Sequence, residues 1–194
     1  MQPISINLSS KSELWKHFIF PLSPCFKSDS FISKIKAIAI DNKAFTIFEM
    51  IMKPSIQFHY LFDKGFYFPH RKNLKKFILI LFKKEGFSVD TINYIFCSDS
   101  FLLKINQKFL KHSSFTDIIT FQLSDNGQPI ISDIYISVDR IKYNSKSFAI
   151  SFKDELHRVI FHGALHLCGC EDKGLKEGDK MKEREDFYLG KYLK

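Results

Sequence analysis

Apolar segments along the chain predict four β-strands. Side chains alternate between apolar and polar character over 55–61, which is typical of a half-buried strand. β-branched and aromatic residues dominate 91–97, 115–122 and 130–138, and these residue types favour strands. The last two segments are separated by Asn126-Gly127, a dipeptide typical of hairpin turns. We therefore expect a single four-stranded sheet that contains one hairpin.

Segments with a helical period alternate with these strands. Over 73–85 the apolar residues recur on one helical face, and Gly86 follows the helix end. Shorter helices are predicted over 99–110 and 139–148, and a charged helix over 176–189 closes the chain. Because strands and helices are mixed, the predicted class is α+β, with one mixed sheet covered by helices.

Residues 1–51 have a different pattern. They contain Pro21, Pro24 and a serine-rich run over 28–33, with only short apolar patches. A second methionine, Met52, stands directly before the first strong strand. We expect residues 1–51 to be an N-terminal extension outside the core, or an upstream start that the cell does not use, and residues 52–194 to be the folded domain.

The segment 152–172 contains two histidines one helical turn apart. Ser151 is typical of a helix start and Gly169 of a helix stop, so His162 and His166 share a helix face. Apart from these imidazoles, residues 159–168 are apolar or glycine, which predicts a buried helix. Buried imidazoles need hydrogen-bond partners or a metal.

Two kinds of partner fit this spacing. A backbone carbonyl or a carboxylate would satisfy a single histidine, whereas two neutral imidazoles one turn apart also form half of a zinc site. The turn after Gly169 carries Cys170, Glu171 and Asp172, each of which has the chemistry of a third ligand.

Gly163 directly follows the first histidine. Zinc peptidases of the H-E-x-x-H type need a glutamate there as general base, so the sequence argues against that chemistry. Glycine in a helix interior costs about 1 kcal/mol relative to alanine. We therefore expect a substrate, a neighbouring backbone or tight helix packing to come close at this position.

The charge balance favours an anionic partner. The 194 residues include 29 lysines and arginines against 21 aspartates and glutamates, a net charge of +8. Nucleic acid is favoured over a membrane, because no segment is apolar enough to span or insert, although a generally lysine-rich composition explains part of the charge. The four cysteines do not form a secreted disulfide pattern, and no signal peptide is recognisable. A cytoplasmic location is expected.

Three blocks of the chain resemble one known family. The YbeY family of metal-dependent endoribonucleases, which act in bacterial ribosomal RNA maturation, has the signature H-G-x-L-H-L-x-G, and residues 162–169 read HGALHLCG. Asn106 with the strand 116–121 resembles a second block, and 133–137 resembles a third, in the same order and spacing. The resemblance covers about residues 52–175 and implies a zincin-like metal site on a buried helix.

The resemblance implies one zinc ion per chain, held by His162, His166 and Asp172. Many family members have a third histidine at the last position, so Asp172 is a departure. Two histidines and a carboxylate still form a recognised catalytic zinc set with a fourth position for water. Because the carboxylate cancels one positive charge of the metal, we expect a more alkaline activity profile than in a three-histidine relative.

A second departure concerns phosphate binding. Many members carry an arginine where this chain has Leu110, which cannot pair with a phosphate. His112 is a candidate replacement as a phosphate donor or acid, with an ordinary surface histidine as the equal alternative. Lys108 and Lys111 are further candidates nearby.

Other residues are expected beside the metal helix. Thr116, Asp117 and Ser137 would position the scissile phosphate or orient the metal ligands. Surface lysines would hold the RNA backbone by charge, and aromatic stacking, with Phe121 as a candidate, would select single strands.

The resulting prediction is a zinc-dependent, single-strand-specific endoribonuclease that acts on rRNA precursors. Implied roles are late processing of the 3′ end of small-subunit rRNA and ribosome quality control, with the small subunit as a partner. One rival is a non-catalytic ribosome-assembly or RNA-binding protein with a structural zinc site, closed by Cys170 or, less favourably, Cys168. A hydrolase of peptides or other small substrates is a second rival.

Overall fold

In the computed structural model, residues 4–7, 53–61, 66 and 69–194 are described. The strands are β1 (Ile4–Asn7), β2 (Ser55–Tyr60), β3 (Val89–Cys97), β4 (Ile118–Gln122) and β5 (Ile130–Ser137). The helices are α3 (Arg71–Lys84), α4 (Asp99–Ile105), the π-helical turn η2 (Asn106–Leu110), α5 (Val138–Ser147), α6 (Phe152–Leu167) and α7 (Leu175–Tyr192).

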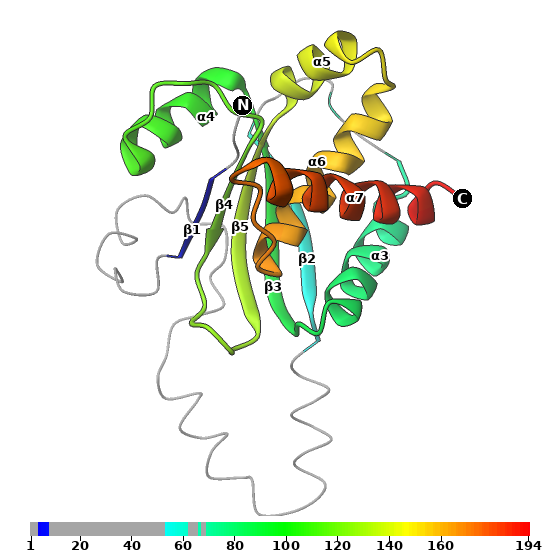
Figure 1. Cartoon of the computed structure of the whole chain (residues 1–194). Coiled ribbons are helices and arrows are strands. Elements are labelled where there is room, and N and C mark those ends of the chain that lie inside the picture. The colour runs from blue at the N-terminus through cyan, green and yellow to red at the C-terminus, as the bar shows by residue number, and fades with distance from the viewer. Residues whose placement is uncertain (1–3, 8–52, 62–65, 67–68) are drawn as a thin grey trace, which may run out of the picture.

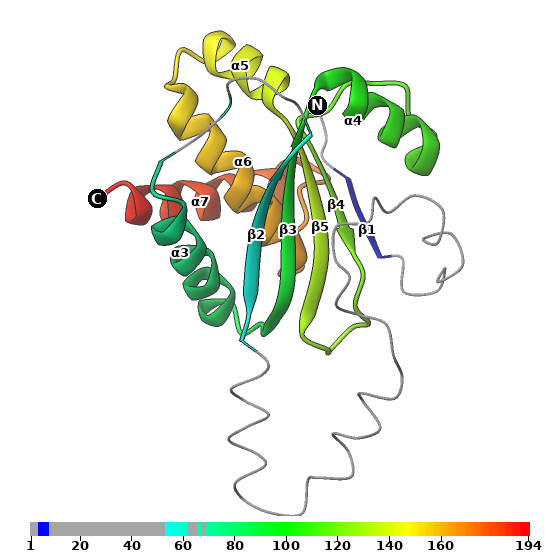
Figure 2. The same ribbon diagram turned by 180° about the vertical axis from the view of Figure 1, so that it is seen from behind.

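The strands form one mixed sheet in the order β1-β4-β5-β3-β2 (Figure 2). β2, β3 and β5 are parallel, whereas β4 pairs antiparallel with β5. The β4–β5 connection turns at Gly127, whose φ of 81° is a conformation that favours glycine. The predicted α+β class, the mixed sheet, its four strands and the hairpin are confirmed.

The N-terminal segment supplies a fifth strand that the sequence pattern did not predict. β1 pairs in parallel with β4, so that Ile4 lies opposite Ile119. This strand comes from the segment predicted to be an extension outside the core. The proposed boundary at Met52 lies outside the described residues.

Helices α3, α6 and α7 lie over one face of the sheet (Figures 1 and 2). Of these, α6 packs on β4 and β5 and also on α3 and α7, so it is the central helix of the fold. Its N-terminus is capped as predicted, because the Ser151 hydroxyl accepts a hydrogen bond from the Asp154 N–H at 3.0 Å.

Gly163 allows α6 to approach the sheet closely. A Cβ atom at this position would lie 2.7 Å from Ile118 Cδ1 and 3.2 Å from Ile134 Cγ2, both shorter than a normal contact. Ile118 and Ile134 are fully buried side chains of β4 and β5. The helix-interior glycine is therefore explained by tight packing and not by a substrate or a neighbouring backbone.

The opposite face of the sheet is covered near α4 and η2. Cys97, Leu102, Ile119 and Phe121 form a second, smaller core cluster there. Phe121 is only 2 % exposed and packs edge-on against Phe109 and Tyr135. The expectation that Phe121 stacks on RNA bases is therefore wrong, because β4 is covered on both faces.

β4 is shorter than predicted. The strand was expected over 115–122 but begins at Ile118, and residues 115–117 lead into it. The Asp117 carbonyl still accepts a hydrogen bond from the Ser137 N–H at 2.8 Å. This lead-in segment therefore stays attached to the end of β5, beside the start of α5.

Candidate metal centre

After α6, the chain folds back towards the last turn of this helix. Gly169 has a φ of 78°, and the Cys170 N–H donates to the Leu165 carbonyl at 3.0 Å, a hydrogen-bond pattern typical of a glycine-terminated helix. Asp172 follows two residues later. As a result, its carboxylate faces the two histidines of the preceding helix.

Three side chains converge at this point. The Nε2 atoms of His162 and His166 lie 2.8 Å apart, and Asp172 Oδ2 lies 4.0 Å from the former and 3.9 Å from the latter. Their potential ligand atoms all lie within 4.8 Å of one another. In a tetrahedral zinc site with Zn–N bonds of about 2.0–2.1 Å, ligand atoms are about 3.3–3.4 Å apart, and the observed distances bracket this value.

The other ring nitrogens fix which tautomer each histidine adopts. His166 Nδ1 lies 2.9 Å from the Cys170 carbonyl oxygen, which can only accept, so Nδ1 carries the proton. His162 Nδ1 lies 2.6 Å from Glu185 Oε1 and donates to this carboxylate in the same way. In the neutral imidazoles, both Nε2 atoms are therefore unprotonated, and each carries a lone pair.

This donor set fits a divalent cation. Two Nε2 lone pairs facing each other at 2.8 Å, with a carboxylate oxygen beside them, repel unless a proton or a metal ion lies between them. Burial, with a further effect from the charge of His162, lowers the pKa of His166 to about 4. His166 is thus neutral at neutral pH, and no proton then lies between the two Nε2 atoms.

A network from α7 holds His162 in position. Glu185 Oε2 accepts a hydrogen bond from Arg158 Nη1 at 3.2 Å, and the same Arg158 nitrogen lies 2.6 Å from Asp186 Oδ1. Carboxylate–histidine pairs of this kind orient metal ligands and increase their basicity. Glu185 was not predicted, because one buried carboxylate on an otherwise charged helix gives no signal in the sequence.

Among the predicted catalytic residues, Asp117 is affected by the charge of His162. Burial raises its pKa above the ordinary value, and the charge of His162 opposes part of this rise. Its Oδ2 accepts a hydrogen bond from Asn144 Nδ2 at 3.2 Å. Burial also raises the pKa of Glu155, whose side chain shares Asn144 as a hydrogen-bond partner.

Thr116 and Ser137 make local structural hydrogen bonds. The buried Thr116 hydroxyl donates to the Ile118 carbonyl at 3.2 Å. The buried Ser137 hydroxyl donates to Asp99 Oδ1 at 2.5 Å and accepts from the Arg140 N–H at 3.1 Å, which caps α5. Both residues flank Asp117 without joining the group of metal-ligand atoms.

His112 lies on an exposed loop after η2 and is not part of the metal-ligand group. The buried Asn106 holds this loop, because its Nδ2 donates to the Ser114 carbonyl at 2.7 Å. Leu110 packs against the smaller core cluster, and Lys108 and Lys111 are exposed beside it.

The competing ligands from the turn after α6 are directed elsewhere. Cys170 Sγ accepts a hydrogen bond from Arg184 Nη1 at 2.8 Å. Glu171 is exposed, and Cys168 packs against the main core. Among the described residues, the group that can hold a metal consists of His162, His166 and Asp172.

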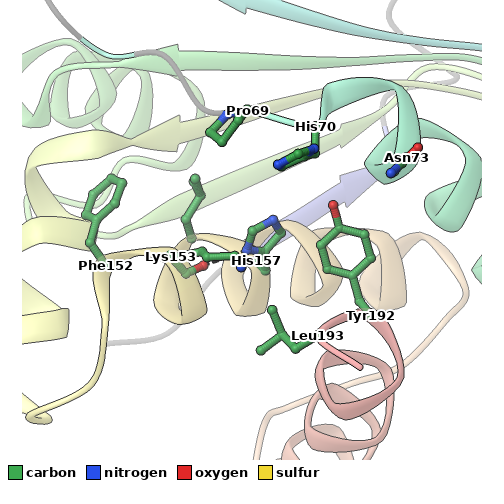
Figure 3. Close-up of a pocket in the computed structure, with 9 residues that line it drawn as sticks. Pro69, His70, Asn73, Phe152, Lys153, His157, Tyr192 and Leu193 are labelled. Atoms are coloured by element: carbon green, nitrogen blue, oxygen red, sulfur yellow. Dashed lines mark hydrogen bonds between the residues drawn. The ribbon is translucent and has the colours of Figure 1, made fainter.

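A separate cavity of about 410 Å³ lies against the first turns of α6 (Figure 3). His157 of α6 and Tyr192 of α7 line it, with their rings 4.8 Å apart. The cavity shares no residue with the candidate metal centre. It is lined by Pro69, His70, Asn73, Phe152, Lys153, Leu156, His157, Tyr192 and Leu193.

The fold and site define an α+β protein with a candidate metal centre at the end of a buried helix. Residues 67–193 match the family described as "Endoribonuclease YbeY", and the chain therefore belongs to this family. Among the described residues, every helix is too short or too polar to cross a membrane.

Two relatives named "Endoribonuclease YbeY" illustrate the similarity. The protein from Cytophaga hutchinsonii is 43 % identical over 138 residues, which cover 71 % of this chain and 96 % of the relative. The protein from Karelsulcia muelleri is 40 % identical over 131 residues, which cover 68 % and 92 %. The solution structure of TM1509 from Thermotoga maritima is similar with a TM-score of 0.50 and 28 % identity, covering 71 % of this chain and 88 % of that chain.

Proposed function

We propose that this protein is a zinc-dependent endoribonuclease that cleaves single-stranded regions of rRNA precursors. Its proposed roles are late processing of the 3′ end of small-subunit rRNA and ribosome quality control, in the cytoplasm and on the small subunit. Membership of the family supports the reaction class. The observation that carries the proposal is the convergence of two Nε2 lone pairs and one carboxylate oxygen.

Three protein ligands would leave a coordination position for water or substrate. A divalent cation held by His162, His166 and Asp172 would polarise a phosphoryl oxygen and activate a water. Zinc suits this set of two imidazoles and one carboxylate. Glu185 and the Cys170 carbonyl hold the two imidazoles with their Nε2 atoms directed to one point.

Asp117 would act on the proton that moves during phosphodiester hydrolysis. Its raised pKa makes the carboxylate a better proton acceptor than an exposed aspartate. Asn144 holds this carboxylate by the hydrogen bond to Oδ2. Thr116 and Ser137 would keep the strand ends around Asp117 in place, and the exposed His112 would approach the phosphate from the neighbouring loop.

The net charge of +8 supports binding to the RNA backbone. Exposed lysines attract phosphates without reading sequence, so binding should weaken steeply as salt rises. Selection of single strands requires aromatic or shape contacts in addition.

A non-catalytic protein with a closed, structural zinc site is the second candidate function. It requires a fourth protein ligand, for which Cys170 was the best candidate. The hydrogen bond from Arg184 to Cys170 Sγ argues against this role. The described residues bring three potential protein ligands together, and a zinc site with three protein ligands is typical of catalysis.

The direct test is cleavage of a labelled single-stranded RNA by the full-length protein. Wild type should cleave, whereas the His166→Ala variant and a chelated wild-type sample should not. Equal cleavage in all three samples would indicate a contaminating nuclease. No cleavage in any sample, with zinc still bound to wild type, would favour the assembly protein.

A further inference from the structure

Two large aromatic side chains are exposed on the segments that flank Asp117 and Asn144. Phe115, in the segment that leads into β4, is 41 % exposed, and Tyr143, on α5, is 61 % exposed. Phe121, which belongs to the same lead-in and strand, is buried. An exposed aromatic face is therefore available near the site, but from different residues than the sequence suggested.

One guanidinium group connects these two rings. The Arg140 guanidinium carbon lies 4.9 Å from the ring centre of Phe115 and 5.3 Å from that of Tyr143, within the range of cation–π contacts. Arg140 is itself fixed by an ion pair with Asp99, in which Nη2 and Oδ2 are 2.7 Å apart. Phe115, Arg140 and Tyr143 thus form a fixed group, here called the aromatic platform.

The aromatic platform is continuous with the metal centre through Asp117. Phe115 precedes Asp117 by two residues, and Tyr143 is followed by Asn144, which donates to the Asp117 carboxylate at 3.2 Å. Ile118, which follows Asp117, packs its Cδ1 atom against Gly163, the residue after His162. The platform is therefore connected to the metal centre through Asp117 and its neighbours.

Positive side chains lie near the platform residues along the chain. Lys142 and Lys146 are exposed on α5, beside Tyr143, and Lys111 and His112 are exposed on the loop before Phe115. Sites for single-stranded nucleic acid combine cationic groups for phosphates with aromatic faces for bases. This combination favours RNA as the occupant of the platform.

From this geometry we infer that Phe115 and Tyr143 form a base-stacking subsite for a nucleotide that flanks the cleaved phosphodiester. The inference rests on the proposed function and names the contacts that select single strands. Bases in a duplex already stack on each other, so only an unpaired base can stack on these rings.

The test uses a short single-stranded RNA that carries 2-aminopurine, a base whose fluorescence is quenched by stacking. The full-length protein is studied with chelator, so that the RNA stays intact, and the dissociation constant and quenching are measured for wild type, Phe115→Leu, Tyr143→Leu and the double variant. Phe87→Leu is the control, because Phe87 is 40 % exposed but lies after α3, outside the platform.

Each platform variant should weaken binding about 5- to 100-fold, and the double variant should also lose the quenching. Tyr143→Trp, in contrast to Tyr143→Leu, should keep both the affinity and the quenching of wild type. With metal present, KM should rise more than kcat falls, since the rings do not touch the reacting atoms. The melting temperatures should stay near that of wild type, because both rings are exposed.

The outcomes separate this inference from the proposed function. If wild type binds and cleaves RNA and the double variant matches Phe87→Leu, the subsite is wrong, the proposed function stands, and a protein becomes the better occupant of the platform. If wild type neither binds nor cleaves single-stranded RNA, both the function and the subsite are wrong.

Discussion

Helix α6 carries histidines on two faces, and the two faces have different chemistry. His157 is 4 % exposed, and its Nδ1 lies 2.6 Å from the Lys153 carbonyl one turn earlier. Its ring packs against Tyr192 beside the cavity of Figure 3. This histidine has a hydrogen-bond partner and an aromatic contact, so it needs no metal ion.

His162 and His166 differ in the direction of their Nε2 atoms. Their Nδ1 atoms also have partners, in Glu185 and the Cys170 carbonyl, but their Nε2 atoms face each other at 2.8 Å. The residue type is the same on both faces, and the metal-site histidines are only partly exposed. The comparison shows that a metal centre is recognised by lone pairs that converge without a proton donor, and not by the presence of buried histidine.

Alanine substitutions on the two faces should have the most different effects on cleavage. His166→Ala removes a proposed metal ligand and should slow RNA cleavage by on the order of 10³-fold or more, because a catalytic metal would supply several kcal/mol of transition-state stabilisation. His157→Ala should keep cleavage within about 10-fold of wild type. Initial rates at saturating zinc measure this difference, and equal losses in both variants would contradict the assignment of the two faces.

The network behind His162 should have the next largest effect. Glu185→Gln removes the negative charge that His162 Nδ1 contacts, and should weaken metal binding by about 10- to 100-fold. Asp186→Asn is the matched control, because Asp186 pairs with the same Arg158 but is not hydrogen-bonded to His162. Competition with a fluorescent zinc chelator gives both affinities. Similar weakening in both variants would mean that Arg158, and not Glu185, supports the site.

His157 should affect stability and its pH dependence, but not metal binding. His157→Ala should lower the free energy of unfolding by about 1–3 kcal/mol at neutral pH, through loss of a buried hydrogen bond and its packing. Urea unfolding of the metal-free proteins measures this change, and zinc binding should be unaltered.

The pH dependence follows from the lowered pKa of His157, which burial causes. The ordinary pKa of histidine is about 6.5, and below this pH the unfolded chain binds a proton at His157 more readily than the folded protein does. The contribution of His157 to stability is therefore complete above about pH 6.5. It is lost as the pH falls from there through the lower folded-state pKa. Wild type should therefore lose more stability than His157→Ala between pH 7 and pH 5. Parallel pH curves would contradict this.

The smallest expected effect concerns the carboxylate ligand. Asp172→His would make the ligand set neutral and should move the pH–rate profile towards acid. The shift should be smaller than about 2 pH units, which is the difference between the pKa of water on zinc in a three-histidine site and that of water on aqueous zinc. Profiles of kcat/KM for both proteins, each loaded with zinc, test this. Superimposable profiles would remove Asp172 from the metal's immediate surroundings.

Much of this centre could be predicted because it is local in sequence. The spacing of His162 and His166 and the helix stop at Gly169 fall within one helix and its turn, where a fixed period places side chains. Glu185 and Asn144 could not be predicted, because their partners are 23 and 27 residues away and depend on how helices pack.

The sheet shows the same limit. The strand segments were predicted from residue type, but Phe121 was wrongly expected to be exposed. Because β4 is buried on both faces, it has no alternating pattern to indicate its inner side. β1 was missed because a four-residue edge strand carries too few positions to show a period.

The measurement that tests the central claim most directly is the metal content of the folded protein by native mass spectrometry. After exposure to excess zinc and removal of free metal, wild type should carry one zinc ion per chain, and a His162→Ala/His166→Ala variant should carry none while keeping the wild-type charge-state distribution. A folded double variant that still carries one zinc ion, or a folded wild type that carries none, would contradict the assignment of this centre.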